Sequence, residues 1–191
     1  MATTPTTLTR LSAWCGLLAG LGIALTGGIE GFLGETAPTS FVLGLTPALA
    51  IPLLVALYQG HAAAAGRFGE VAYLVNLLGL GLFGGAAFTL NMALYHSTEP
   101  LAGSTRIALL GSAVVLAAGS VLFGVSMLRT KVYPAVAVWG YTVVLAIFAL
   151  AAPLPDSPLT SGLHVLAGAS IAWLALALPV RQPVPARGSL P

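Results

Sequence analysis

Charged side chains are scarce in this chain of 191 residues: seven are Lys or Arg, five are Asp or Glu, and together they make up 6% of the sequence. Soluble domains carry about 25% charged residues. This scarcity, with 58% hydrophobic residues and a mean hydropathy of +0.98, excludes a soluble globular fold and indicates an integral membrane protein. The net charge of +2 is small and dispersed, so we expect no nucleic-acid partner and take membrane lipid as the surroundings of the chain.

Cysteine is also nearly absent, since Cys15 is the only one. A disulfide framework and a metal centre built from several cysteines are therefore excluded. The sequence also lacks a glycine-rich phosphate loop after a strand, a His-Glu-x-x-His pair and a Gly-x-Ser-x-Gly elbow. We therefore predict no cofactor, no metal and no catalytic activity.

What the sequence does contain is long apolar runs. A membrane-spanning helix needs about 20 mostly apolar residues, because the hydrocarbon core is about 30 Å thick. Six stretches meet this requirement: Leu11 to Phe32, Phe41 to Gln59, Val71 to Tyr95, Ile107 to Leu128, Tyr133 to Ala152, and Leu159 to Leu178. The predicted fold is therefore all-α, an integral membrane bundle of six transmembrane helices.

The breaks and ends of the chain fit this division. Residues 1–10 and the Pro-rich residues 180–191 are predicted tails, and residues 11–179 are the predicted transmembrane domain. The first apolar run is longer than that of a signal peptide, so we interpret it as a retained helix. Before the last run, Ser157 is a predicted N-cap and Pro158 the first helical residue, a position where the missing N–H of proline is harmless.

The distribution of basic residues predicts the orientation. Cytoplasmic loops carry an excess of Lys and Arg. With the N-terminus inside, the predicted inner segments hold six of these residues and the outer segments only Arg106; the inner six are Arg10, Arg67, Arg129, Lys131, Arg181 and Arg187. An even number of spans then places both termini in the cytoplasm. The excess of Arg over Lys and the abundance of Ala, Gly, Leu and Pro are typical of a GC-rich genome, so we predict a bacterial plasma membrane.

Small residues recur every four positions in several predicted helices. This spacing lets helix backbones approach closely, and close packing drives helix association in lipid. The residues predicted to pack helices together are Gly16, Gly20, Ala24 and Gly28 in the first stretch, Gly81 and Gly85 in the third, and Gly168 and Ala172 in the sixth. The first interpretation is packing inside the bundle. The alternative is a homo-oligomer or a partner membrane subunit bound through the long stripe of the first helix.

Two prolines lie within the second predicted span, Pro47 and Pro52. Each removes a backbone N–H donor, so we expect a kink in this helix unless neighbouring groups satisfy the freed carbonyls.

A group of polar residues is predicted near the outer face, and we call it the outer polar seam: Glu30, Thr89, Asn91, His96, Glu99 and His164. His164 should face the packed interior and form a hydrogen bond with Asn91 of another helix. His61, by contrast, should be solvated at the inner interface. The seam has three open interpretations: structural hydrogen bonds, a vestibule for a small solute or protons, and ligation of a haem or metal by the histidines. The roughly 7 Å difference in depth between the histidines argues against haem.

The sequence alone favours a non-catalytic membrane protein with a structural, accessory or regulatory role, beside a larger membrane complex. The alternative is a small transporter or channel subunit for a neutral or weakly charged solute. No Lys, Arg, Asp or Glu lies near the middle of any predicted span, which argues against a charge-coupled pump. A cavity that reaches the middle of the membrane would favour transport, whereas a tightly packed bundle with an exposed glycine stripe would favour the accessory role.

The predicted topology is testable with reporter fusions. Fusions after Ser97 and after Pro155 should report an outer location, and a fusion at Pro191 should report the cytoplasm, because the basic residues favour this orientation. An outer signal at Pro191 would contradict either the number of spans or their orientation.

Overall fold

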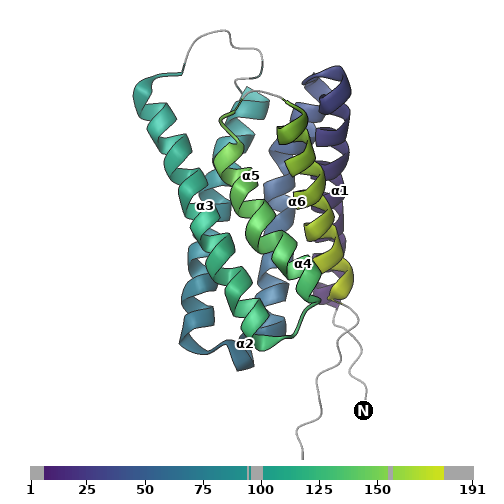
Figure 1. The fold of residues 1–191 in the computed structure, drawn as a ribbon, viewed down its shortest axis with the longest axis vertical. Helices are drawn as coiled ribbons and strands as arrows, with labels where there is room; N and C mark the ends of the chain where they lie inside the picture. The colour runs from purple at the N-terminus through teal and green to yellow at the C-terminus, as the bar shows by residue number, and fades with distance from the viewer. Residues whose placement is uncertain (1–6, 94, 96–100, 155–156, 179–191) are drawn as a thin grey trace, which may run out of the picture.

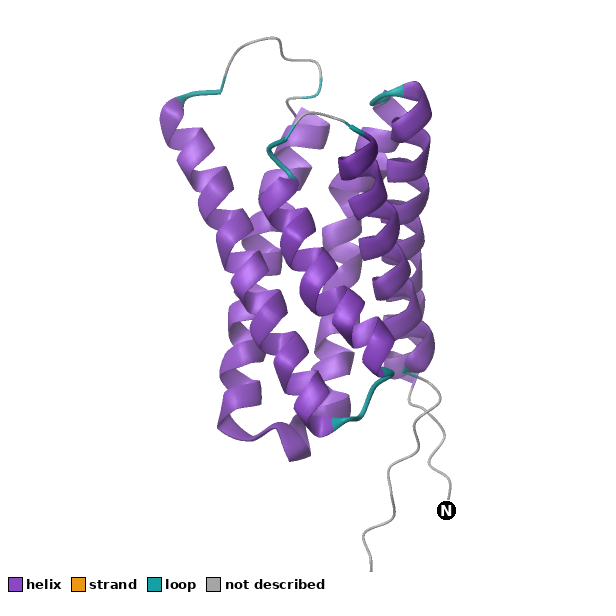
Figure 2. Ribbon diagram, viewed as in Figure 1, coloured by secondary structure: helices purple, strands orange, loops and turns teal. Residues whose placement is uncertain are grey.

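The computed structural model describes residues 7–93, 95, 101–154 and 157–178, and within these ranges the chain is helical without β-strands (Figures 1 and 2). The elements are α1 (Thr7–Leu33), α2 (Ala37–Phe88), the π-helix η1 (Thr89–Ala93), α3 (Gly103–Thr130), α4 (Ala135–Trp139), the π-helix η2 (Gly140–Val144), α5 (Leu145–Ala151) and α6 (Pro158–Ala177). The predicted all-α class is confirmed.

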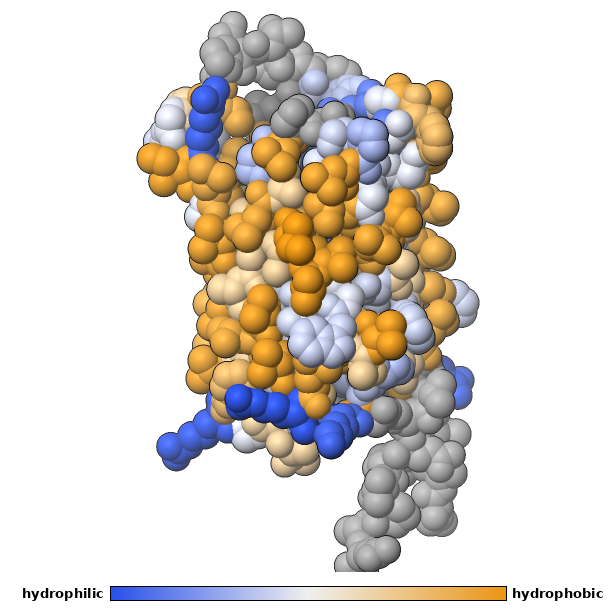
Figure 3. All heavy atoms as spheres, viewed as in Figure 1, coloured by the Kyte–Doolittle hydropathy of each residue, from blue (hydrophilic) through white to orange (hydrophobic). Residues whose placement is uncertain are grey.

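Within the part of the chain that the structure describes, four helices are long and apolar enough to cross a membrane: Thr7–Leu33, Ala37–Met92, Gly103–Thr130 and Pro158–Ala177. On the face seen in Figure 3, apolar side chains form a broad band between hydrophilic groups near the two ends of the bundle. The structure divides the chain differently from the sequence analysis. One long helix covers the second and third predicted stretches, and a shorter apolar helix, Ala135–Ala151, replaces the fifth.

The long helix α2 reverses its direction at Gly66. This residue has φ 57° and ψ −166°, a conformation open to glycine because it has no Cβ. The two arms on either side, 37–65 and 67–88, run antiparallel along each other. The rings of Tyr58 and Tyr73 stack with their centroids 4.3 Å apart, and further along Pro47 packs against Gly84. α2 is therefore a helical hairpin whose tip lies at the lower end in Figure 1.

The same end of the bundle holds the first described turn of α1 and the junction between α3 and α4 (Figure 1). Four basic residues belong to these segments and to the tip of α2: Arg10, Arg67, Arg129 and Lys131. We call this the basic end. The opposite end holds the last turn of α1, the start of α3 and the start of α6.

Two helices begin with well-defined caps. The side chain of Ser157 accepts a hydrogen bond from the Thr160 N–H at 3.2 Å, and the Thr160 hydroxyl accepts one from the Ser157 N–H at 2.8 Å. Pro158 occupies the first turn. The predicted N-cap is therefore confirmed. Thr36 and Thr39 form the same capping box at the start of α2, a motif that satisfies backbone donors a helix start would leave unpaired.

Close backbone contacts join the helices in pairs. A Cβ at Gly20 of α1 would lie 2.6 Å from both the Ala172 nitrogen and the Gly168 oxygen of α6. The second arm of α2 approaches α3 in the same way, since a Cβ at Gly79 would lie 2.6 Å from the Leu116 Cα. Both crossings are too tight for any larger residue.

The other predicted packing residues are placed as follows. Gly16 packs against Leu53 of α2, Ala24 against Gly168, and Gly28 makes only a loose contact with Val165. Gly81 and Gly85 differ from the expectation, because both are exposed and have open space where a Cβ would be. The face of α2 that meets α3 passes through Gly79, two residues away, so Gly81 points outward.

The hydrogen bonding that the two prolines disrupt in α2 is restored in part by a side chain. The backbone of α2 stays helical through Pro47 and Pro52, and Gly66 is its single non-helical residue. Pro47 deprives the Leu43 carbonyl of its usual N–H partner, and the Thr46 hydroxyl donates a hydrogen bond to this carbonyl at 2.9 Å. Threonine commonly satisfies freed carbonyls in membrane helices in this way.

The crossing of α1 and α6 generates a prediction. Gly20→Leu should lower the free energy of unfolding by at least about 1–3 kcal/mol, the usual effect of overpacking, because its side chain would collide with backbone atoms of α6. Thermal unfolding in mild detergent measures the change. Gly81→Leu is the matched control and should leave stability unchanged or slightly higher, because leucine favours helix and Gly81 faces open space. Equal stability of both variants would contradict the close contact between Gly20 and the backbone of α6.

Candidate functional site

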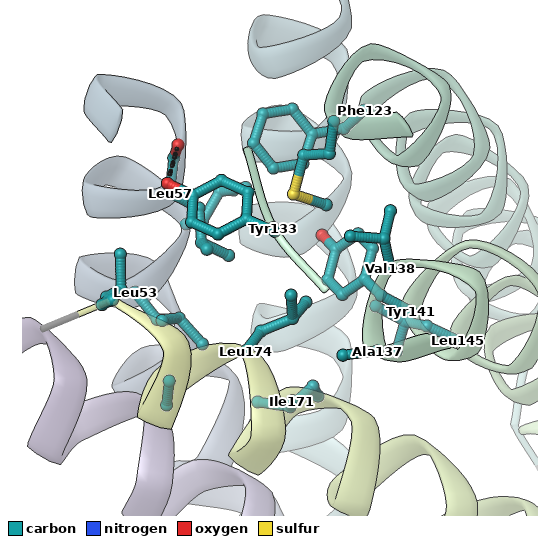
Figure 4. Close-up of a cluster of buried hydrophobic side chains, with 14 of the residues drawn as sticks. Leu53, Leu57, Phe123, Tyr133, Ala137, Val138, Tyr141, Leu145, Ile171 and Leu174 are labelled. Carbon is teal, nitrogen blue, oxygen red and sulfur yellow. Dashed lines mark hydrogen bonds between the residues drawn. The ribbon is translucent and has the colours of Figure 1, made fainter. Parts of the chain in front are cut away.

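The half of the bundle nearer the basic end has a dense hydrophobic core. Phe123 and Met127 of α3, Leu57 of α2 and Leu174 of α6 are all fully buried there. Figure 4 shows this core and the Tyr133 side chain that reaches into it, where the hydroxyl donates a hydrogen bond to the Leu57 carbonyl at 2.8 Å. The core closes this half of the molecule.

The opposite half encloses a cavity of about 550 Å³. Glu30, Glu35 and Pro153 line it at the end of the bundle, and Leu57 and Tyr141 line it near the dense core. Helices α1, α2, α3, α5 and α6 all contribute to its wall. The volume lies within the range of about 300–1,000 Å³ that is typical of small-molecule sites.

The wall of this cavity is mainly apolar. Its deeper part is formed by leucine and isoleucine side chains from several helices, among them Leu53, Leu116 and Ile171. Alanines such as Ala50 and Ala87 line it as well, and their short side chains leave space between the helices. Polar side chains gather nearer the end of the bundle. An apolar pocket with a few polar groups is the usual form of a ligand site.

Both π-helices contribute side chains to the cavity. Leu90 and Asn91 of η1 line it on one side, and Tyr141 of η2 lines it near its floor. π-helical turns are rare and occur frequently at functional sites. Their presence at two places on one cavity wall is independent support for a functional role.

Three residues of the predicted outer polar seam line this cavity: Glu30, Asn91 and His164. Glu30 is 8% exposed, and the other two are half-buried. Thr89 lies apart from them, because its side chain is exposed and its hydroxyl donates to the Gly85 carbonyl at 2.8 Å. His96 and Glu99 lie outside the described residues.

The expected hydrogen bond between Asn91 and His164 is not formed. The Asn91 amide donates to the Ala87 carbonyl at 2.8 Å, and His164 Nδ1 pairs with the Thr160 carbonyl at 2.8 Å. Each side chain thus bonds to the carbonyl four residues earlier in its own helix, which is within reach whatever the neighbouring helices do. His164 does face the interior, where its ring meets Phe148 edge to face with the centroids 4.7 Å apart.

His61 is also placed differently from the expectation. It is 2% exposed, because the hairpin of α2 packs this part of the first arm against α3. Its Nδ1 lies 2.7 Å from the Leu57 carbonyl oxygen and its Nε2 lies 3.3 Å from the Ser126 hydroxyl. A carbonyl oxygen only accepts, so Nδ1 carries the proton and donates it to this bond. The predicted solvation of His61 is therefore wrong.

A second polar cluster escaped the sequence analysis. Asn76 is fully buried. Its side-chain NH2 group donates a hydrogen bond to the Tyr141 hydroxyl, and its side-chain oxygen Oδ1 accepts one from the Ser120 hydroxyl at 3.4 Å. The cluster joins α2, α3 and η2 beside the floor of the cavity. The available signal was an asparagine in the middle of an apolar span, on the same face as Ala72 and Gly79.

Among the residues that the structure describes, no group of three or more His, Cys, Asp or Glu side chains is close enough to hold a metal ion.

The buried cluster predicts energetic coupling between Asn76 and Tyr141. Asn76→Leu and Tyr141→Phe should together destabilise the protein by less than the sum of their separate effects. The expected coupling energy is about 0.6–1.7 kcal/mol, the range measured for hydrogen bonds between membrane helices. Unfolding in mixed micelles provides the double-mutant cycle. As a control, the effects of Thr89→Val and Tyr141→Phe on stability should be additive, because the Thr89 hydroxyl bonds to a carbonyl of its own helix. Coupling of equal size in both cycles would contradict a specific hydrogen bond between Asn76 and Tyr141.

The comparisons with known proteins give no relative from which a function could be transferred. The chain matches no family model, and no curated protein or solved structure is detectably similar to it.

Proposed function

We propose that the chain crosses a bacterial plasma membrane six times, with both termini in the cytoplasm. The spans would be α1, the two arms of α2, α3, the helical stretch Ala135–Ala151 and α6. The stretch Ala135–Ala151 has 17 residues, which extend over about 26 Å, close to the thickness of the hydrocarbon core. The gathering of basic residues at one end supports the orientation, because positive loops stay in the cytoplasm.

Within this topology, we propose that the protein binds a small, mainly apolar solute, as a small transporter or channel subunit. The observation that carries the proposal is the cavity, whose wall extends from the end of the bundle to the dense core. Its wall includes Glu35 and Pro153 at the end of the bundle opposite the basic end, which is the outer end in the proposed topology. The sequence alone favours a structural or accessory role, whereas the cavity favours a small transporter or channel subunit.

The packing of α1 supports the same preference. The accessory role depended on a glycine stripe that a partner subunit could cover. Gly20 and Ala24 are covered instead by α6 of the same chain, and Gly16 is covered by Leu53. The part of the stripe with the closest contacts is thus already used inside the bundle.

A solute would enter between the polar groups at the end of the bundle and come to rest against the apolar side chains below. Further passage requires the floor to open, because Leu53, Leu57 and Tyr141 close the cavity toward the basic end. The hydrogen bond from Asn76 to Tyr141 holds one side of this floor in place. We propose that this bond is among the contacts that change when a solute passes.

Filling the cavity should abolish binding of a neutral apolar probe. Ala50 lines the cavity and is half-buried, whereas Ala48, on the same helix, is exposed on the outer surface. Ala50→Phe should reduce binding of tritiated 1-naphthalenemethanol to the protein in lipid nanodiscs by at least about tenfold, or 1.4 kcal/mol, because the phenyl ring takes up the space. Binding to empty nanodiscs is subtracted.

Ala48→Phe is the matched control and should bind the probe as the wild type does. Absence of saturable binding in the wild type, or equal binding by Ala50→Phe and the wild type, would overturn the proposed function.

A further inference from the structure

A groove of about 160 Å³ lies on the outer surface of the bundle at the basic end, between the start of α1 and the end of α6. The residues that line it are Arg10, Ala13, Trp14 and Leu17 of α1 and Ala175 and Leu176 of α6. Small-molecule sites usually enclose about 300–1,000 Å³. The volume of this groove therefore suits a segment of one hydrocarbon chain better than a whole small molecule.

The groove forms because large side chains project from the bundle beside small ones. Trp14 is 63% exposed and Leu176 is 59% exposed, so these two side chains form walls that rise from the surface. Ala13 and Ala175 line the groove as well, and their methyl groups fill little of the space. In a membrane this surface meets the lipid, so acyl chains are the molecules that can enter it.

The groove has a charged end and an apolar end. Arg10, Trp14 and Leu17 share one face of α1, since they are four and three residues apart. Arg10 is exposed in the first turn of α1, and Leu17 is half-buried about 10 Å further along the helix. The charge thus lies at the end of the bundle and the apolar part lies toward its middle. A phospholipid has the same order, with its phosphate at the surface and its acyl chains inside.

The groups at the charged end select the headgroup. The guanidinium of Arg10 is positively charged and offers several N–H donors, which suit a phosphate. The indole N–H of Trp14 is a further donor, and tryptophan side chains commonly lie at the level of the headgroups. None of the described residues that line the groove is acidic, so the ammonium of a zwitterionic headgroup would find no carboxylate here. A headgroup with a net negative charge is therefore favoured.

We propose that this groove binds an anionic phospholipid of the cytoplasmic leaflet. Its phosphate pairs with Arg10, and one of its acyl chains lies between Trp14 and Leu176 and extends to Leu17. Basic pockets between membrane helices on the cytoplasmic side are known to bind such headgroups. The site is separate from the cavity of the proposed function, because the two have no lining residue in common.

Quenching of Trp14 fluorescence by brominated lipids tests the proposal. The chain has three tryptophans; Trp139→Phe and Trp173→Phe, both at exposed positions, leave Trp14 as the single fluorophore. The protein is reconstituted into vesicles of phosphatidylglycerol and phosphatidylcholine, with one or the other lipid brominated in its acyl chains. Phosphatidylglycerol should occupy the position beside Trp14 about five times more readily, the gain expected from one basic residue at a membrane surface.

Equal occupancy by the two lipids would overturn the proposal. Weak quenching of Trp14 by both lipids would overturn it too, because something other than lipid would then cover the groove.

Variants of the arginine locate the effect. Arg10→Gln should reduce the preference for phosphatidylglycerol to about one, and Arg10→Lys should keep most of it because the charge is retained. Arg67→Gln is the matched control, since Arg67 is exposed at the tip of the α2 hairpin, at the same end of the bundle but outside the groove; it should keep the fivefold preference. An unchanged preference in Arg10→Gln, or an equal loss in Arg67→Gln, would overturn the assignment to this groove. Binding of the naphthalene probe in the cavity should be the same in all three variants, so the proposed function is tested separately.

Discussion

Close approach of helix backbones at small residues is the interaction on which the rest of this structure depends. Lipid tails are as apolar as leucine, so membrane helices gain little from burying apolar side chains and associate through close packing instead. Gly20 and Gly168 join α1 to α6, and Gly79 and Gly119 join the second arm of α2 to α3. The chain is thereby organised as two tight pairs. The cavity lies where side chains of both pairs face each other and the alanines among them are too short to fill the space.

The sequence was informative about elements whose cause is local. Long apolar runs predicted the helices, and Ser157 with Pro158 predicted the start of α6, because a cap depends only on residues within one turn. The choice of helix face was harder to predict. Gly81 and Gly85 have the same four-residue spacing as Gly16 and Gly20, yet they point outward. Spacing shows that a face is suited to packing, but the partner helix decides which face is used.

The candidate site was predictable only in outline. Glu30, Asn91 and His164 of the predicted seam do line the cavity, whereas Asn76 lies deeper in its span, away from the group of polar residues near the outer face. The hydrogen-bond partners of these side chains could not be predicted from the sequence, for another reason. An asparagine or histidine in a helix always has a carbonyl one turn earlier within reach, and Asn91 and His164 both use it. A bond between two helices requires their rotation about their axes to be known, as the burial of His61 against Ser126 illustrates.

The reversal at Gly66 has a mechanical consequence. A single residue outside helical geometry, Gly66, joins the two arms of α2, so the connection between them is too short to extend. Neither arm can slide along its axis without taking the other with it, and the stacked rings of Tyr58 and Tyr73 hold the two together close to the turn. The hairpin is thus the stiff side of the cavity. Any widening of the cavity falls to the helices on its other side, α5 and α6, which are two separate helices, the first ending at Ala151 and the second beginning at Pro158.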